Sequence, residues 1–326
     1  MLIKKIRFFQ VISLLILFTV AVLSGYRIGG LDYYQYVSMI KNIQTVDGLF
    51  SKILIAKDPM FGIVVSLVNP LRPDAYVNVF TVVAMLAFLT KLSFIWELKR
   101  AVIFSVLYFI LIAPSLDFAA IRAMLGVFFL IGFLKFYSQR SFILAFIFGF
   151  FSVISHVSMA LPILLSLGFV KGVYDWNRYL FVFLFFLFGF LSKPLFALFK
   201  NTSTYIEVGG TYLAFVPVLL LIINLLVYSQ LVKNERNTNF NNLVFYLVTI
   251  LTVFSLAMLH NVVIIGMRYM QIAQVLLLVA LCSANFRMTY NKFLLWVISF
   301  VIFCIPLVYR NVSLNLWSEM LKSINL

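Results

Sequence analysis

Residues 8–24 read FFQVISLLILFTVAVLS, an uncharged apolar run that follows closely on Lys4, Lys5 and Arg7. A helix needs roughly 20 predominantly apolar residues to cross the hydrocarbon core of a bilayer, with a range of about 17 to 25. Basic residues before the run, together with the lack of a clear A-x-A cleavage site, are typical of an uncleaved signal anchor. The run therefore predicts a first membrane span whose N-terminus lies on the cytoplasmic side.

The rest of the chain has a composition that agrees with this start. Of its 326 residues, 64% are hydrophobic and 11% are charged, whereas a soluble domain is about half apolar and roughly a quarter charged. So few charges cannot cover a water-exposed surface, which excludes a soluble enzyme and a disordered protein. Cys282 and Cys304 both lie in apolar runs and indicate neither a disulfide framework nor a metal site. We therefore predict an all-α, polytopic integral membrane protein.

Further apolar stretches follow the first one and together predict about eleven spans. They lie at residues 75–96, 102–114, 119–137, 142–156, 157–170, 179–199, 212–230, 243–260, 264–284 and 293–309. Three of these are short for a full crossing, and a single helix over residues 142–168 is the alternative interpretation of two of them. Residues 59–69 are interpreted as a segment that dips into the membrane without crossing it.

The distribution of charge indicates which loops lie inside. The formal net charge is +15, and because Lys and Arg gather in cytoplasmic loops, it implies no nucleic-acid partner in a membrane protein. With the N-terminus inside, the inner loops hold 14 Lys and Arg, Lys91 among them, against 3 Asp and Glu, a net charge of +11. A single helix over residues 142–168 would place Lys233 and Arg236 outside, against the positive-inside rule. We therefore predict an inner N-terminus and an outer C-terminus.

The predicted domain organisation is a single transmembrane domain, residues 1–326, without internal repeats. Two polar loops lie on the predicted outer side, residues 25–74 with the dipping segment and residues 200–211. Apolar and polar residues alternate in the tail, residues 310–326, in a pattern typical of an amphipathic helix on the outer surface.

Ionisable residues beside the spans are the most informative ones, because lipid does not solvate them unless they are paired or reached by water. On the predicted topology they gather at the outer face, and both histidines of the chain are among them. They are Arg27, Asp32, Asp58, Asp117, Arg122, His156, His260 and Arg268.

Several of these residues also have a purely structural interpretation. Arg27 lies just beyond a span, from which it could reach lipid headgroups. Asp32 and Asp58 each precede an apolar segment, as helix N-caps do, and the proline after Asp58 suits the first helical position. The two histidines could cap or join helices, and the tyrosines that follow Asp32 could form an interfacial aromatic belt. Arg122 is hardest to explain in this way, since apolar residues flank it on both sides.

The residue types indicate which ligands such a face would bind. Arginine's planar fork pairs bidentately with phosphate and keeps its charge when partly desolvated, so several arginines at one membrane edge favour a lipid-linked phosphate or pyrophosphate. Aromatic rings beside the Asp32 carboxylate suit a sugar. The chain has no H-E-x-x-H, no D-x-D and no Cys/His cluster at ligand spacing, so neither a metal nor a cofactor is expected.

The order and spacing of these residues resemble the EpsG family, membrane proteins grouped with Wzy-type O-antigen and capsular polysaccharide polymerases. The resemblance runs from about residue 20 to about residue 285. It rests on Tyr26-Arg27, Gly30-x-Asp32-Tyr33-x-x-Tyr36, Asp58-Pro59-x-Phe61, Arg122, His156 with Ser158, and Arg268 with Tyr269. Asp58 departs from the family, which usually has Glu before this proline.

The resemblance implies a GT-C-like membrane glycosyltransferase that polymerises repeat units of a surface polysaccharide. Undecaprenyl-pyrophosphate-linked oligosaccharides would serve as donor and acceptor at the periplasmic face of the bacterial inner membrane. Neither a nucleotide sugar nor a metal is implied. Membrane lipid is a further expected partner, and a chain-length regulator protein is a candidate one.

The implied reaction gives each candidate residue a role. The departing pyrophosphate would be stabilised by fixed guanidinium groups, and the attacking hydroxyl would lose its proton to either His156 or Asp32, between which the sequence does not choose. The residues assigned to pyrophosphate are Arg122, Arg268 and Arg27. The residues assigned to the sugars are Tyr33, Tyr36, Asp58 and His260.

Three other functions are alternatives, of which a ligase is the hardest to distinguish from a polymerase. A flippase or transporter of the lipid-linked oligosaccharide usually has ionisable groups near mid-membrane, whereas here the charges are predicted at one face. An outer-face acyltransferase would also use a histidine base. A ligase that transfers finished polymer to another carrier shares the same donor chemistry.

Overall fold

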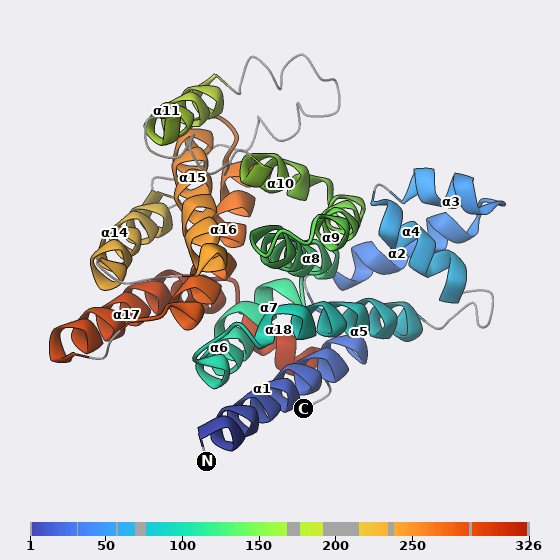
Figure 1. Ribbon diagram of the computed structural model, residues 1–326. Helices are drawn as coiled ribbons and strands as arrows, with labels where there is room; N and C mark the ends of the chain where they lie inside the picture. The colour runs from blue at the N-terminus through green and yellow to red at the C-terminus, as the bar shows by residue number, and fades with distance from the viewer. Residues whose placement is uncertain are drawn as a thin grey trace. The chain divides into compact units, whose positions relative to one another are not determined.

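The computed structural model describes residues 2–30, 32–56, 58–68, 76–167, 177–191, 215–233, 238–286 and 289–324 (Figure 1). Every regular element in these ranges is a helix, which confirms the all-α prediction. The chain divides into two compact units, the first made of residues 1–163 and 307–326 and the second of residues 164–306. Each unit is described by itself.

The first unit contains the N-terminal half of the chain and its C-terminal end. Its helices are α1 (Leu2–Gly25), α2 (Tyr33–Gln44), α3 (Leu49–Ile55), α4 (Pro59–Val68), α5 (Tyr76–Ile95), α6 (Ala101–Leu107), the π-helix η2 (Tyr108–Ile112), α7 (Ala113–Leu116), α8 (Ile121–Ser138), α9 (Phe142–Ser155), the 3-10 helix η3 (Val157–Met159) and α18 (Leu316–Ser323). Two further helices, α10 (Ala160–Leu167) and α17 (Tyr290–Ser313), cross the boundary between the units.

Helix α8 is the core of the first unit. It is apolar on all sides, as expected of a helix that is covered all round, and its residues 124–134 are buried without interruption. Helix α5 packs against it, α9 covers another side, and α1 lies against α5 and α6 (Figure 1). The Phe128 ring of α8 stacks on that of Phe94, with centroids 6.0 Å apart. The order of packing therefore brings the first span and α8 to opposite sides of α5.

The π-helix is an irregular turn, and two of its carbonyl groups accept hydrogen bonds from side chains near the C-terminal end of the chain. Pro114 has no N–H, so the Ile110 carbonyl lacks its ordinary helical donor; the Trp317 indole donates to it instead, at 2.7 Å. The Asn311 side-chain amide donates to the Leu111 carbonyl at 3.0 Å. The C-terminal segment is thus part of the fold of this turn.

The C-terminal tail, residues 310–326, was predicted to hold a short amphipathic helix, and the structure has α18 (Leu316–Ser323) in this tail. Helix α17 continues through Arg310 to Ser313, the chain then turns at Asn315 in a left-handed conformation (φ 51°), and α18 follows. Leu316 and Met320 of α18 are buried, and the helix contacts α7. Part of the apolar face of α18 therefore covers protein.

The second unit is built from α11 (Asn177–Phe190), α14 (Phe215–Val232), α15 (Asn239–Asn261), α16 (Val263–Ser283) and most of α17. Helices α15 and α16 form its main pair. They approach closely at Gly266, where a Cβ atom would lie 3.0 Å from the backbone nitrogen of Leu259. Polar side chains join other helices, as where the Asn224 amide donates to the Ser299 carbonyl at 2.8 Å.

Seven described helices are long and apolar enough to cross a membrane, which confirms a polytopic membrane protein. They are Phe8–Gly25, Tyr76–Ile95, Ile121–Ser138, Phe215–Val232, Asn239–Leu259, Val263–Ser283 and Tyr290–Ser313. The shorter apolar helices are Pro59–Val68, Ala101–Leu116, Phe142–Ser155 and Val157–Leu167. The chain is extended at His156 (φ −161°), so the described residues 142–167 form two helical segments and not a single helix, as predicted; residues 168–170 of the second predicted segment lie outside the described residues. The loop predicted at 200–211 lies outside the described residues.

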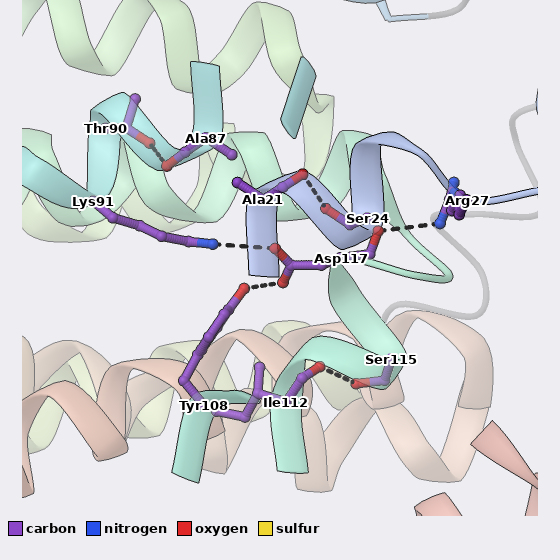
Figure 2. Close-up of polar contacts among 10 residues, drawn as sticks. All are labelled: Ala21, Ser24, Arg27, Ala87, Thr90, Lys91, Tyr108, Ile112, Ser115 and Asp117. Carbon is purple, nitrogen blue, oxygen red and sulfur yellow. Dashed lines mark hydrogen bonds and ion pairs between the residues drawn. The ribbon is translucent and has the colours of Figure 1, made fainter. Parts of the chain in front are cut away.

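The prediction that Lys91 lies in an inner loop is wrong. Lys91 belongs to α5, is fully buried, and its Nζ lies 3.1 Å from Oδ1 of Asp117, which was predicted at the outer face (Figure 2). The two partners of an ion pair cannot lie on opposite sides of a membrane. The Tyr108 hydroxyl donates to the other Asp117 oxygen, and the Tyr108 and Phe128 rings lie 4.5 and 4.4 Å from Nζ. These contacts compensate for lost solvation of the ammonium group.

We expect Lys91→Ala to destabilise the protein by about 3–5 kcal/mol, because it leaves the Asp117 carboxylate buried without its cation. Lys322→Ala is the matched control, since it removes an exposed pair with Glu319 and should cost less than about 1 kcal/mol. Thermal unfolding of the two purified variants in detergent measures the difference. Equal stability of the two variants would contradict a structural role for the Lys91–Asp117 pair.

Candidate active site

Asp58 connects two other candidate residues of the first unit. Its backbone carbonyl accepts hydrogen bonds from the Phe61 and Gly62 amides, at 3.1 and 3.3 Å, and so starts α4. Its buried carboxylate pairs with Arg122 through Oδ2, and Oδ1 lies 3.3 Å from Nδ1 of His156. Charge-assisted contacts of this kind are stronger than neutral hydrogen bonds. The carboxylate that resembled a simple helix cap therefore holds an arginine and a histidine together.

Arg122 brings a positive charge to the edge of accessible space. It lies in the first turn of α8, its guanidinium carbon is 5.2 Å from the centre of the Tyr36 ring and 5.9 Å from that of Phe61, and its side chain is 20% exposed. With Ser155 and apolar side chains of α4, α5 and α8 it lines a small pocket. The paired guanidinium is therefore partly exposed, and the pocket beside it has room for about one water molecule.

His156 reaches Asp58 because α8 and α9 approach closely at a glycine. Gly126 lies one turn after Arg122, and the Ser152 hydroxyl of α9 donates to its carbonyl at 2.8 Å. A Cβ atom at Gly126 would lie 3.2 Å from Cβ of His156 and 3.0 Å from Cγ of Met159. These distances are tighter than ordinary side-chain contacts, so the glycine in α8 favours the close approach that places the imidazole.

Tyr36 lies in contact with two arginines. Its ring is buried in α2, 5.8 Å from the guanidinium carbon of Arg27 and 5.2 Å from that of Arg122. Burial raises the pKa of the Tyr36 phenol, while Arg122 and Arg27 lower it. The Phe61 and Phe80 rings complete its surroundings, at 5.8 and 6.1 Å. Tyr36 thus connects the Asp58 cluster to Arg27.

Arg27 forms a second polar group with Asp117 and Asp32. The guanidinium is fully buried after the end of α1, donates through Nη1 to the Asp117 carbonyl at 3.1 Å (Figure 2), and lies 4.9 Å from the centre of the Phe80 ring. Burial lowers the pKa of Arg27, and Tyr36, Asp32 and Asp117 raise it. Asp32 occupies the N-cap position of α2 without a side-chain cap bond. Of the two predicted bases, His156 therefore contacts Asp58, and Asp32 acts electrostatically on Arg27.

The tyrosines assigned to sugar binding lie in the core. Tyr33 packs on Phe80, with ring centroids 5.4 Å apart, and Tyr36 is buried as described. Tyr34 is 76% exposed and is the open ring of this segment. Sugar binding by Tyr33 and Tyr36 stays a prediction.

The last two candidates belong to the second unit. Arg268 is exposed on α16, next to Tyr269, whose ring is buried 5.2 Å from that of Phe254. His260 lies in the last turn of α15, and its side chain is outside the described part of the structure. Their participation in the same site as Arg122 stays a prediction.

The Asp58–His156 contact suits base catalysis. When Nδ1 carries the proton and donates to the carboxylate, the lone pair is on Nε2, and the carboxylate stabilises the imidazolium formed by proton uptake. This pairing was missed in the sequence, because the partners are 98 residues apart and Asp-Pro before an apolar run is typical of a helix start. Among the described residues, no group of three or more His, Cys, Asp or Glu side chains could hold a metal ion.

Comparison with known proteins identifies the family of the chain. The sequence profile of the EpsG family matches residues 10–322, nearly the whole chain. The chain belongs to the EpsG family. EpsG is a family of Wzy-like polymerases. No curated protein and no solved structure matches the chain. In this EpsG-family protein, the residues that carried the resemblance in the N-terminal half lie together in the first unit.

We expect Gly126→Ala to move His156 away from Asp58 and to destabilise the protein by about 1–3 kcal/mol, because the added methyl group overpacks the α8–α9 contact. The chain has two histidines, so histidine-labelled protein gives two sets of imidazole NMR signals. The set that disappears in His156→Gln belongs to His156. The His156 signal should shift in Gly126→Ala. Gly266→Ala overpacks the second unit in a similar way and should leave that signal unchanged. An unmoved signal in Gly126→Ala would show that the glycine does not position the imidazole.

Proposed function

We propose that this EpsG-family protein is a polysaccharide polymerase. It joins undecaprenyl-pyrophosphate-linked oligosaccharide repeat units at the outer face of the bacterial inner membrane. The observation that carries the proposal is the Asp58 carboxylate, which holds His156 on one oxygen and Arg122 on the other beside a small pocket. The family supports the reaction class.

The base in this reaction is His156. Nε2 takes the proton of an acceptor sugar hydroxyl, and the freed oxygen forms a bond to the anomeric carbon of the donor. The bond from that carbon to the pyrophosphate oxygen breaks, and its electron pair leaves with the pyrophosphate. Pyrophosphate is already a good leaving group, so no general acid is required. The proposed reaction uses no nucleotide sugar and no metal.

Arg122 and Asp58 supply the electrostatics of the step. Arg122 offers a fixed positive charge to the departing pyrophosphate, and preorganised charge of this kind is often the largest catalytic term. Asp58 orients the imidazole and pairs with the imidazolium after proton uptake. Because Asp58 contacts both groups, a shift of this one carboxylate would disturb the base and the cation together. Arg27 and Arg268 remain further candidates for pyrophosphate binding.

The buried Lys91–Asp117 pair is the feature that would favour a transporter, since intramembrane charges mark transport pathways. Both side chains are covered, however, and each has its partner. The pair therefore suits the joining of helices better than passage of a substrate. Analysis of products separates a polymerase from a ligase. Loss of a polymerase leaves a single repeat unit on the carrier, whereas loss of a ligase leaves no sugar on the second carrier, to which the ligase would transfer the finished polymer.

We expect His156→Ala to cause single-repeat product to accumulate in place of long chains, with polymerisation at least a hundredfold slower, because the hydroxyl has lost its base. Asp58→Asn should slow the reaction as well, since the imidazole loses its orienting charge. Gel analysis of polysaccharide from cells with equal protein levels measures chain length, with Lys322→Ala as a surface control. Normal ladders in His156→Ala would reduce His156 to a structural residue.

The proposed sidedness can be tested with single cysteines in a protein lacking Cys282 and Cys304. Tyr34 and Lys99 are both exposed, and the predicted topology places them on opposite sides. Tyr34→Cys should react with an impermeant maleimide added to spheroplasts, and Lys99→Cys should react only after permeabilisation. The reverse pattern would place the Asp58 site on the cytoplasmic side and would exclude the proposed reaction.

A further inference from the structure

Two guanidinium groups near the α7 turn, of the fully buried Arg27 and the partly buried Arg310, have covered hydrogen-bond donors that no described residue accepts. In Arg27 these donors are Nε and Nη2, and in Arg310 they are Nε and Nη1. Buried polar groups in folded proteins nearly always have a partner, and a charged donor without one is costly. The four nitrogens therefore indicate a ligand with several acceptor oxygens.

The two arginines hold the same turn of the chain. Arg27 donates through Nη1 to the Asp117 carbonyl at 3.1 Å, and Arg310 donates through Nη2 to the Ser115 hydroxyl. These acceptors are two residues apart at the end of α7, within a single helical turn of about 5.4 Å rise. Arg27 comes from the end of α1 and Arg310 from the end of α17, so segments far apart in sequence meet at α7.

A backbone contact fixes the segment that follows Arg27 against the C-terminal helix. The Ile28 amide donates to the Ser323 carbonyl at 2.8 Å. Gly30 has a φ of 100°, and a Cβ atom there would lie 3.1 Å from the Phe118 carbonyl oxygen, so a glycine is needed for the chain to pass. Arg27 is thus held in place on the same side as the α17–α18 segment that carries Arg310.

The charges around this turn favour an anion. The Asp117 carboxylate pairs with Lys91 and accepts a hydrogen bond from Tyr108, so the charge of Lys91 already balances its negative charge. Asp32 and Asp117 are the acidic residues that act on Arg27. Three cations, Arg27, Lys91 and Arg310, therefore stand against two carboxylates. The excess positive charge and the free donors are on the two arginines.

We propose that Arg27 and Arg310 together bind a phosphate group at the α7 turn. The tetrahedral oxygens of a phosphate match two guanidinium forks, and arginine remains charged when desolvated. A membrane-embedded protein can obtain such a group from a phospholipid headgroup or from a polyprenyl pyrophosphate. The carrier-lipid source rests on the proposed function, in which Arg27 is already a candidate for pyrophosphate binding, whereas the headgroup source does not.

The competing explanation is that Arg310 only links α17 to α7 through Ser115. The two explanations make different predictions for two variants. Arg310→Gln removes the charge and the fork, whereas Ser115→Ala removes the acceptor of the link and leaves the guanidinium intact. If the arginines bind phosphate, Arg310→Gln should weaken phosphate binding, and Ser115→Ala should leave it nearly unchanged.

The full chain, purified without phospholipid in a maltoside detergent, is titrated with undecaprenyl pyrophosphate in one arm and with phosphatidylglycerol in the other. Native mass spectrometry measures the bound fraction in each arm. Arg310→Gln should weaken binding of the ligand by about 10- to 100-fold, the loss expected of charge-assisted hydrogen bonds. Ser115→Ala should bind within threefold of the unchanged protein. Arg310→Lys keeps the charge but loses the planar fork, so its affinity should lie between those of the unchanged protein and Arg310→Gln. It replaces Arg310→Gln in the experiment if that variant does not fold.

The pattern across the arms identifies the source of the phosphate. Dependence on Arg310 with undecaprenyl pyrophosphate alone indicates a carrier lipid, and the same dependence with phosphatidylglycerol indicates a headgroup site. Wild-type affinity of Arg310→Gln and Arg310→Lys for both probes would overturn the proposal, as would an equal loss in Ser115→Ala. Since no polymer is measured, either result leaves the proposed function to its own test.

Discussion

The buried carboxylate of Asp117 is the interaction on which the first unit depends. It pairs with Lys91 of α5, accepts from Tyr108 of the π-helix, and its backbone carbonyl accepts from Arg27. A charge removed from water is tolerated only when its remaining hydrogen-bonding capacity is also satisfied. Asp117 meets this condition by drawing three segments together: α5, the π-helix, and the chain that leaves α1. The irregular turn from Tyr108 to Asp117 therefore determines where Arg27 lies.

Asp58 and Asp117 are both carboxylates with two side-chain partners, and their surroundings give them different uses. The partners of Asp117 are sealed in the protein interior, so the group holds helices together and can take part in little else. The partners of Asp58 include an arginine that is partly exposed beside a pocket, and a histidine whose second ring nitrogen can accept a proton. A proton arriving at His156 would meet a carboxylate already in place. This difference in access makes the Asp58 cluster the better candidate for chemistry.

Much of the fold follows from hydrophobicity along the sequence, and the sites follow from it only in part. Long apolar runs predict the seven spans because the bilayer requires a minimum length, and the histidine between two short runs indicates the break at residue 156. Lys91 was misplaced because a lysine near a span end usually reaches out to water, and only the folded chain shows that Asp117 and two aromatic rings receive it. The pairing of Asp58 with His156 was equally hidden. It depends on the close approach of α8 and α9 at Gly126, which hydropathy does not reveal.

The C-terminal segment illustrates a different limit of sequence interpretation. Its amphipathic pattern suggested a helix on the membrane surface, yet its polar side chains complete a turn some 200 residues earlier in the chain. Pro114 leaves the Ile110 carbonyl without a helical donor, and the indole of Trp317 supplies one. The same segment brings Arg310 to Ser115, where two of its guanidinium nitrogens are covered and unpaired. Lys91, a fully buried cation, has a carboxylate and two rings around it. A fold that compensates one buried cation so fully, and leaves donors open on two arginines beside it, is better explained by a binding site than by imperfect packing.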